Sequence, residues 1–402
     1  MFGNSARRLS ALASAAVLSC SALTGCGTGT SSKKEPETPE EFRAAMIERS
    51  VVSTGNTARL NKVFDRAANG EDITVAYVGG SITEGYAAGA RSPKCYASVS
   101  AADFEKNYCK GGKVICQNNG LSGTPSVLGN LRAASEVLPS EPDIIFLEFA
   151  VNDGMETDYK VSYESLVRTC LEAENEPAVI LLFTYMETGH TCQEQQQEIG
   201  KHYDLGMISV RDAILPEMEA GRMTWKEYGD DDVHPTVEGH ALLGEFIAEY
   251  FRKAKAKKAD ASYRLPENTV YPELYRNAAL YDAAGIPYRD GAWTPGTNDG
   301  YFKAGFVYQP DEGNEPLTMT VTGKSLFLVY KKSGDKKYGM ATVFVNGERA
   351  AIVQGYGVNA WGGPAVELIQ TNGSVQEMKV EIKMLDDQTD KAFEVFAIGT
   401  AE

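Results

Sequence analysis

Short apolar runs alternate with amphipathic stretches through the first two thirds of the chain. The apolar runs are almost uninterrupted, as in parallel strands that are covered on both faces. They lie at residues 73–78, 114–117, 143–149, 178–185 and 207–210. Stretches with helical character separate them, at residues 96–108, 127–137, 163–172 and 193–203. This alternation predicts an α/β sandwich built on a parallel sheet.

Helical patterns also stand at both ends of this unit. Residues 39–68 are expected to be helical, with Asn69-Gly70 as the stop. A last helix follows His234-Pro235 and runs to about Lys253, with apolar residues at i, i+4 spacing that dock it on the sheet. The lysine-rich segment that comes next, and the polar stretch up to Pro272, indicate a domain boundary.

From about residue 273 the period of the pattern changes from helical to two. Six runs are expected to be strands, at residues 317–321, 325–330, 342–345, 350–353, 379–384 and 393–398. Asn346-Gly347 lies between two of them and favours a type I′ hairpin turn. The pattern therefore predicts a second, β-rich domain, a β-sandwich or a jelly-roll-like fold.

The N-terminus has the features of a secretory signal. Arg7 and Arg8 precede an uncharged apolar stretch from Leu9 to Leu23, which is too short for a stable membrane-spanning anchor. The sequence Leu23-Thr24-Gly25-Cys26 resembles the bacterial lipobox, which implies cleavage before Cys26 and a diacylglycerol on its sulfur. The alternative is an ordinary signal peptide and a soluble secreted protein.

Together these patterns divide the chain into five parts. We expect a lipoprotein signal peptide at 1–25, a flexible tether at 26–38, a catalytic domain at 39–258, a linker at 259–272 and an accessory domain at 273–402. The mature protein is then expected on the extracytoplasmic face of the cell membrane, anchored through the lipid on Cys26. The sequence does not predict an oligomeric state.

Composition and charge narrow the class of partner. The chain has 402 residues, of which 43% are hydrophobic, so it can bury a sizeable core. Its formal net charge is −16. Such a surface repels phosphate backbones and anionic lipid head groups, which argues against nucleic-acid binding and against electrostatic docking on a membrane.

Five cysteines remain beyond the signal segment and the lipidation site. They are Cys95, Cys109, Cys116, Cys170 and Cys192. An odd number argues against a full disulfide framework, and a Cys95–Cys109 pair and free thiols are both open. No CxxC motif occurs, so zinc and thioredoxin chemistry are not expected.

Unusual residues follow the predicted strands, where functional groups gather in open parallel sheets. The first strand ends in Gly79-Gly80-Ser81, a sharp turn that presents a hydroxyl. The second is followed by a polar segment that ends at Gly123, and the third by Asn152-Asp153. Asp231-Asp232-Val233-His234 precedes the last helix.

These four blocks resemble, in order and in position, those of the SGNH (GDSL-like) hydrolase family, over roughly residues 50–255. The resemblance implies a flavodoxin-like three-layer fold and a serine esterase that needs no metal and no cofactor. It places the nucleophile on Ser81, the oxyanion donors on Ser81, Gly123 and Asn152, and the Asp-x-x-His pair on Asp231 and His234. Two positions depart from the family pattern: Gly80 replaces its aspartate and Ala150 its usual glycine.

The chemistry of these residue types agrees with that assignment. A serine hydroxyl is a poor nucleophile until a base accepts its proton, and histidine titrates near working pH. Pro235 biases His234 away from helical backbone and leaves it free to reach Ser81. Asp231 can orient the ring from its other nitrogen. Backbone amides and the Asn152 side chain can then stabilise an oxyanion.

Several residues admit a structural interpretation beside a functional one. Asn152 with Asp153 is also an ordinary turn sequence, and the acidic run at 230–232 is also a solvated loop. His240 and Glu148 are expected to be structural, Glu148 as a buried, hydrogen-bonded acid. Trp225 and Tyr228, near the catalytic loop, either line the substrate cleft or belong to the core. Three aromatic residues of the second domain either form a sugar-stacking platform or belong to its core: Trp293, Tyr356 and Trp361.

The sequence thus predicts an esterase that removes small acyl groups, O-acetyl above all, from an acylated polysaccharide. The substrate follows from the expected location outside the membrane, where glycans are met. Two alternatives stay open: a lipase or lysophospholipase, and a non-catalytic glycan-binding lipoprotein on a decayed hydrolase fold.

Overall fold

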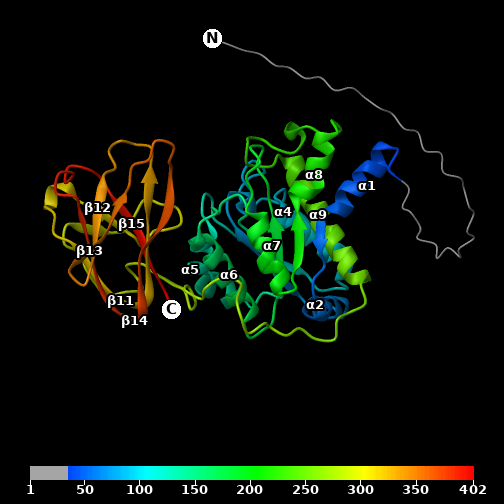
Figure 1. The fold of residues 1–402 in the computed structure, drawn as a ribbon, viewed down its shortest axis with the longest axis horizontal. Helices are drawn as coiled ribbons and strands as arrows, with labels where there is room; N and C mark the ends of the chain where they lie inside the picture. Colours follow the sequence, from blue (N-terminus) through cyan, green and yellow to red (C-terminus); the bar gives the residue numbers. More distant parts are fainter. Residues whose placement is uncertain (1–34) are drawn as a thin grey trace, which may run out of the picture.

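The structure is a computed structural model that describes residues 35–402, which form two domains (Figure 1). The expected signal peptide, Cys26 and most of the expected tether lie outside the described residues. Within residues 35–402, no helix has both the length and the apolar character needed to cross a bilayer.

The first domain is built on a six-stranded sheet. Its strands are β1 (Val51–Ser53), β2 (Ile73–Gly79), β3 (Val114–Gly120), β4 (Ile144–Glu148), β5 (Ala178–Phe183) and β6 (Gly206–Ser209). They lie in the order β1-β6-β5-β4-β2-β3, and β1 alone runs antiparallel to its neighbour. The five parallel strands follow the flavodoxin-like order, which confirms the predicted fold class.

Helices cover both faces of this sheet. One face carries α2 (Ala58–Ala68), α4 (Tyr96–Tyr108) and α9 (Val237–Ala256), with α1 (Pro39–Arg49) and α8 (Val210–Glu219) beside them. The other face carries α5 (Ser126–Arg132), a turn of π-helix (Ala133–Val137), α6 (Thr157–Leu171) and α7 (Gln193–His202). The result is a three-layer sandwich.

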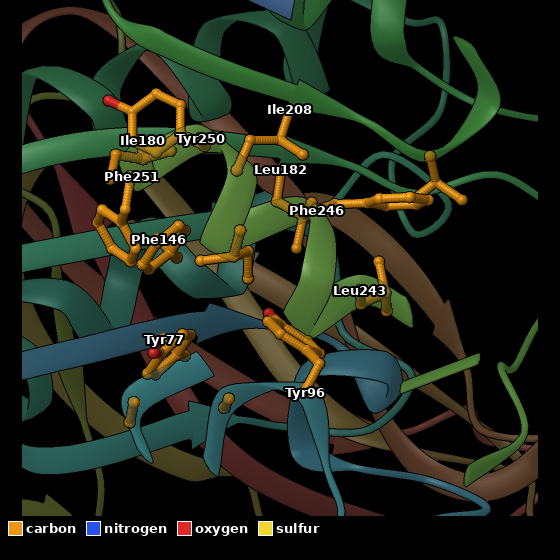
Figure 2. Close-up of a cluster of buried hydrophobic side chains, with 14 of the residues drawn as sticks. Tyr77, Tyr96, Phe146, Ile180, Leu182, Ile208, Leu243, Phe246, Tyr250 and Phe251 are labelled. Carbon is orange, nitrogen blue, oxygen red and sulfur yellow. The ribbon is translucent and has the colours of Figure 1, made fainter. Parts of the chain in front are cut away.

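Alternate strand residues build the core on the α9 side (Figure 2). Tyr77 of β2 and Phe146 of β4 stack with ring centroids 5.1 Å apart. Phe246 and Tyr250 of α9, four residues apart, project onto the same side. The expected i, i+4 stripe therefore docks the last helix, and the burial of such rings supplies much of the packing energy.

The expectation of helix through residues 39–68 was wrong, because a short strand interrupts it. Residues 51–53 form β1, which pairs with β6 at the sheet edge. Gly55 then turns with a positive φ of 55° against the backbone of Leu205, where a Cβ would overlap. β-branched Val51 and Val52 favour the strand. The sequence pattern also missed α8 entirely.

The second domain is a β-sandwich whose strands all pair antiparallel, which confirms this part of the prediction. Its longest strands are β11 (Leu317–Ser333) and β14 (Trp361–Met384). Three further strands belong to the same sandwich: β12 (Met340–Val345), β13 (Glu348–Gln354) and β15 (Glu394–Ala401). Shorter strands are β7 (Ala279–Tyr281), β8 (Tyr288–Arg289), β9 (Trp293–Pro295) and β10 (Phe306–Tyr308).

β11 and β14 run through both layers of the sandwich. Near Gly323 their register shifts, so that the first half of β11 pairs with β8 and the second half with β15. Two strands that the pattern predicts separately, 317–321 and 325–330, are therefore one bent strand. Asn346 and Gly347, with φ of 53° and 84°, make the predicted tight hairpin between β12 and β13.

The two domains share an apolar interface. Leu326 and Leu328 of β11 face the core of the sandwich, whereas Phe327 and Val329 face the first domain. There they pack in one cluster with Leu128 and Leu131 of α5, the helix that borders the second domain in Figure 1. The Asn130 side chain adds a hydrogen bond to the Tyr275 carbonyl at 2.9 Å. Burial on both faces explains why this half of β11 has no polar alternation.

Candidate active site

The carboxyl ends of β2, β3 and β4 meet at one edge of the sheet. Ser81 opens the four-residue helix α3 (Ser81–Glu84) after β2, Gly123 follows β3, and Asn152 follows β4. The strand order reverses at β2, since β3 lies on one side of it and β4 on the other. Such a switch point is where open α/β sheets place their ligand sites.

The structure joins Ser81, His234 and Asp231 by hydrogen bonds. Ser81 Oγ lies 2.7 Å from His234 Nε2. On the other side of the ring, Nδ1 lies 2.8 Å and 3.0 Å from the two carboxylate oxygens of Asp231. The carboxylate requires a proton on Nδ1, which leaves Nε2 as the acceptor for the serine hydroxyl.

Asp231 is fixed by its own loop. Its Oδ1 also accepts the backbone amides of Val233 and His234, at 2.8 Å and 2.7 Å. Burial acts to raise the pKa of this carboxyl, but the hydrogen bonds from His234 and Val233 outweigh burial and lower the pKa below its usual value. Asp231 is thus held ionised, as a partner of an imidazolium requires.

Trp225 and Tyr228 support this loop from the core. Both side chains are buried, and the Trp225 indole donates to the Asp231 carbonyl at 2.6 Å. The backbone of Tyr228 accepts the Thr236 amide at 2.7 Å, just before α9 begins. The structure therefore favours the core interpretation of these two aromatic residues over the cleft wall.

Asn152 explains why residue 80 is glycine. Its side-chain amide lies against Gly80, where any Cβ would overlap the Asn152 Oδ1 atom. This Oδ1 is buried without a hydrogen-bond partner among the described residues. The departure from the family pattern at Gly80 thus makes room for the Asn152 amide beside the serine turn. Ala150, the second departure, is buried and its carbonyl accepts the Cys192 amide at 2.7 Å.

Gly123 belongs to a loop that is tied to the serine turn. Its φ of 70° is one that residues with a Cβ rarely adopt. The neighbouring Ser122 donates its amide to the Glu84 carboxylate of α3 at 3.0 Å. The three candidate oxyanion residues, Ser81, Gly123 and Asn152, are therefore connected to one turn of chain.

Asp153 anchors the loop that carries Asn152. Its fully buried carboxylate accepts the Ser126 amide at 2.8 Å and the Gln196 side-chain amide at 3.0 Å. Burial raises the pKa of Asp153 to about 7, against the effect of these hydrogen bonds. The sequence identified the Asn-Asp pair, but nothing in it showed that the aspartate would link the Asn152 loop to α5 and α7.

Two exposed aromatic side chains flank the site. Tyr86 is 50% exposed, and its ring centroid lies 4.0 Å from that of His234. Trp361, at the start of β14, is 65% exposed and lies beside Gly123, where a Cβ would come within 2.7 Å of the indole nitrogen. The sequence analysis did not single out Tyr86. The clue that the sequence offers is that Tyr86 lies five residues after Ser81. Trp361 brings the second domain to the candidate active site.

The structure separates the three aromatic residues of the second domain, for which a sugar-stacking platform and a place in the core were both open. Trp293 is buried in the sandwich core and packs against Tyr308 with ring centroids 5.3 Å apart. It is therefore unavailable for stacking on a sugar. Tyr356 is half-buried and lies in a bridge with Ser333, which also pairs with Trp361. Trp361 alone of the three stands open at the site.

The other histidine and cysteine candidates have structural surroundings. His240 is buried, and its ring nitrogens face the Tyr96 amide at 3.2 Å and the Tyr86 carbonyl at 3.0 Å, which favours its structural interpretation. All five cysteines of the described chain are free thiols, so Cys95 and Cys109 do not pair. Within residues 35–402, no group of three or more His, Cys, Asp or Glu side chains is placed to hold a metal ion.

Known proteins similar to this chain have the same architecture. The sequence matches the GDSL-like lipase/acylhydrolase family over residues 77–242. Two solved structures of a two-domain esterase active on acetylated mannans, one co-crystallised with mannopentaose, are 26% identical to this chain. The match covers 89% of this chain and 98% of that esterase, with TM-scores of 0.81 and 0.82. Among curated protein sequences, no match was found.

The family match spans the four blocks from the end of β2 to α9, and the two-domain match extends the likeness to the β-sandwich. The hydrogen-bonded arrangement of Ser81, His234 and Asp231 lies within the matched segment. On these grounds residues 77–242 form a GDSL-like (SGNH) hydrolase domain, and the chain is a carboxylic ester hydrolase.

Proposed function

We propose that this protein removes small acyl groups, O-acetyl above all, from a polysaccharide through an acyl-enzyme on Ser81. The observation that carries the proposal is the hydrogen-bonded series from Ser81 through His234 to Asp231, with its two short contacts of 2.7 Å and 2.8 Å. A serine placed in this way against an oriented imidazole is equipped for acyl transfer.

Acylation follows from this geometry. Ser81 Oγ attacks the ester carbonyl while His234 Nε2 accepts the hydroxyl proton, and the imidazolium is stabilised by Asp231. The carbonyl oxygen becomes an oxyanion, for which the Ser81 and Gly123 amides and the Asn152 side chain serve as donors. Each such donor is typically worth about 10²–10³ in rate. When the tetrahedral intermediate collapses, His234 returns the proton to the departing sugar oxygen.

Deacylation repeats the sequence with water as the nucleophile. His234 Nε2 accepts a proton from the water that attacks the acyl carbonyl, and the same donors stabilise the second oxyanion. The proton then returns to Ser81 Oγ as the carbon–oxygen bond breaks. The products are the deacylated sugar, the free acid and the regenerated serine.

Three features support a glycan as the substrate. Tyr86 and Trp361 are exposed on either side of the site, and aromatic faces are suited to the apolar faces of sugar rings. The net charge of −16 favours a neutral polymer over an anionic one. The similar two-domain esterase acts on acetylated mannans, so an acetylated mannan is the first substrate to test.

We also propose that the enzyme works outside the cytoplasm, anchored by a lipid on Cys26. The lipobox-like sequence before Cys26 and the apolar stretch from Leu9 to Leu23 support this location. Metabolic labelling with a radioactive fatty acid tests it in a bacterial host. The wild-type chain is expected to take up label and to fractionate with membranes. Label on a Cys26→Ser variant would contradict the assignment.

Acetate release tests the function itself. Wild-type protein is expected to release acetate from acetylated mannan, and Ser81→Ala to reduce release at least about 10³-fold. Ser135→Ala, an exposed serine on the π-helical turn, serves as the matched control and is expected to keep full activity.

The same assays separate the alternatives. A rate that peaks with long acyl chains would favour a lipase, whereas binding to mannan without hydrolysis of any ester would favour a non-catalytic glycan-binding protein. Either outcome would overturn the proposal of a polysaccharide deacetylase.

A further inference from the structure

Glu148 is a fully buried acid that the acyl-transfer chemistry above does not use. It is the last residue of β4, and in the sheet it pairs with Gly79, two residues before Ser81. Acidic side chains are almost never buried without partners, because removing a carboxylate from water is costly. Its partners therefore show what keeps it there.

Two threonine hydroxyls bind the two oxygens of this carboxylate. Thr83 Oγ1 donates to Oε2 at 2.8 Å, and Thr184 Oγ1 donates to Oε1 at 2.6 Å. Thr83 belongs to α3, the turn that carries Ser81, whereas Thr184 directly follows β5. Glu148 thus connects the serine turn to the end of the strand next to its own.

Each threonine is held by a further contact. Thr83 Oγ1 also bonds the Tyr96 hydroxyl at 2.8 Å, and the Thr184 carbonyl accepts the Thr191 hydroxyl at 2.8 Å. The amides of Gly80 and Thr83 add weaker backbone hydrogen bonds to Glu148. Burial raises the pKa of Glu148 to about 7, and the hydrogen bonds from Thr184 and Thr83 oppose that shift.

The serine turn needs this outside support. Gly80, at the N-cap position of α3, has no side chain with which to cap the first amides of the turn. The Glu148 carboxylate lies against the amides of Gly80 and Thr83, on either side of Ser81, and within the described residues it makes no hydrogen bond to the Ser81 amide. That amide stays available as an oxyanion donor.

We propose that Glu148 is a positioning residue for the nucleophile: through the Thr83 hydroxyl and the backbone of the turn, it fixes Ser81 relative to His234 and to the oxyanion donors. The proposal rests on the proposed role of Ser81, but not on the identity of the polysaccharide. A nucleophile misplaced by about 1 Å loses on the order of 100-fold in rate, so the effect belongs in kcat.

The test measures hydrolysis of p-nitrophenyl acetate by Glu148→Gln, Thr83→Val and the double variant. Glu164→Gln is the matched control, because Glu164 is also a buried acid of this domain. It accepts the Tyr203 hydroxyl and the Val270 and Tyr271 amides, each at 2.7 Å, far along the chain from the serine turn. Thr83→Ser keeps the hydroxyl and tests for rescue. Thermal unfolding of each variant reports loss of stability separately.

Glu148→Gln is expected to lower kcat about 10- to 100-fold with KM within about 2-fold, while Glu164→Gln keeps kcat. Thr83→Val is expected to lose a similar factor, Thr83→Ser to recover most of it, and the double variant to lose no more than the larger single loss. The comparison of Thr83→Val with Thr83→Ser holds even if Glu148→Gln is poorly folded, because neither variant changes Glu148.

Two results would overturn the positioning role: a kcat for Glu148→Gln equal to that of Glu164→Gln, or losses in Glu148→Gln and Thr83→Val that multiply. Ser81→Ala is assayed beside them. If Ser81→Ala retains turnover, the proposed nucleophile has failed. If Ser81→Ala abolishes turnover while Glu148→Gln keeps the kcat of Glu164→Gln, the proposed nucleophile stands and Glu148 is structural only.

Discussion

At the scale of single residues, the site depends on a carboxylate that orients a ring. Asp231 contacts His234 Nδ1 through both of its oxygens. Asp231→Asn presents a donor to this nitrogen and favours the wrong tautomer, so kcat is expected to fall about 10²–10⁴-fold with KM little changed. Steady-state hydrolysis of a nitrophenyl ester measures both constants. A kcat within about 3-fold of wild type would show that Asp231 does not orient the base.

Gly80 gives a second prediction at this scale. In Gly80→Ala the new Cβ overlaps the Asn152 amide and displaces it, so kcat is expected to fall about 10–10³-fold through loss of one oxyanion donor. Gly373→Ala is the control, because no atom lies within 4 Å of a Cβ at that glycine. Equal activity of the two variants would contradict the placement of Asn152 at the oxyanion.

Sequence alone was most informative at this same scale. Ser81, Asn152 and His234 could be identified because each directly follows a strand or precedes a helix in an ordered set of blocks. The positions of Tyr86 and Trp361 could not, since the first depends on how the chain leaves α3 and the second on how another domain docks. The hydrophobic pattern of a short stretch of sequence contains neither the path of the chain after α3 nor the docking of the second domain.

At the scale of elements, the loop that follows β4 makes the stability of the protein depend on pH through Asp153. The pKa of Asp153 is raised by burial from 3.8 to about 7. The folded protein therefore holds this proton more tightly than the unfolded chain, and the associated stability is present below about pH 4 and is lost as the pH rises through 7.

The variant Asp153→Asn tests this contribution of Asp153 to the free energy of unfolding. Between pH 5 and pH 8 the wild-type free energy of unfolding is expected to fall by about 2 to 3 kcal/mol more than that of the variant, by the linkage relation. Urea unfolding of both proteins at the two pH values gives the difference. An identical pH dependence in the two proteins would mean that Asp153 titrates alike in the folded and unfolded states.

Helices and strands were predicted well where the local hydrophobic pattern was unambiguous. They were predicted poorly where contacts with other elements decide the conformation. The helix at 96–108 and the strand from Ile73 follow from strong apolar periodicity. The break between α1 and α2 was missed, since β1 exists only because β6 offers an edge to pair with. Residues 361–378 of β14 were also missed, because their many polar and glycine residues do not resemble a strand until β11 pairs with them.

At the scale of the whole molecule, the β-sandwich is part of the candidate active site. It is docked through Phe327 and Val329 on α5, and it places Trp361 beside Gly123. Trp361→Ala is expected to lower kcat/KM for acetylated mannan about 5- to 30-fold, since an aromatic contact of this kind is worth roughly 1–2 kcal/mol. Activity on p-nitrophenyl acetate, which is too small to need the contact, is expected to change little.

Val358→Ala is the matched control for Trp361. Val358 is 79% exposed in the segment just before β14, so its loss tests whether any apolar truncation there affects the polymer. If both variants lose the same factor on mannan, or if Trp361→Ala loses as much on the small ester, the indole does not bind the polysaccharide.

The proposed mechanism depends on acyl transfer through Ser81. Rapid acid quenching of the wild-type enzyme during hydrolysis of an activated acetyl ester, followed by peptide mass spectrometry, tests it most directly. We expect one acetyl group on the peptide that contains Ser81, assigned to that residue by fragmentation and absent from Ser81→Ala. An acetyl group on another residue, or turnover that persists in Ser81→Ala, would contradict it.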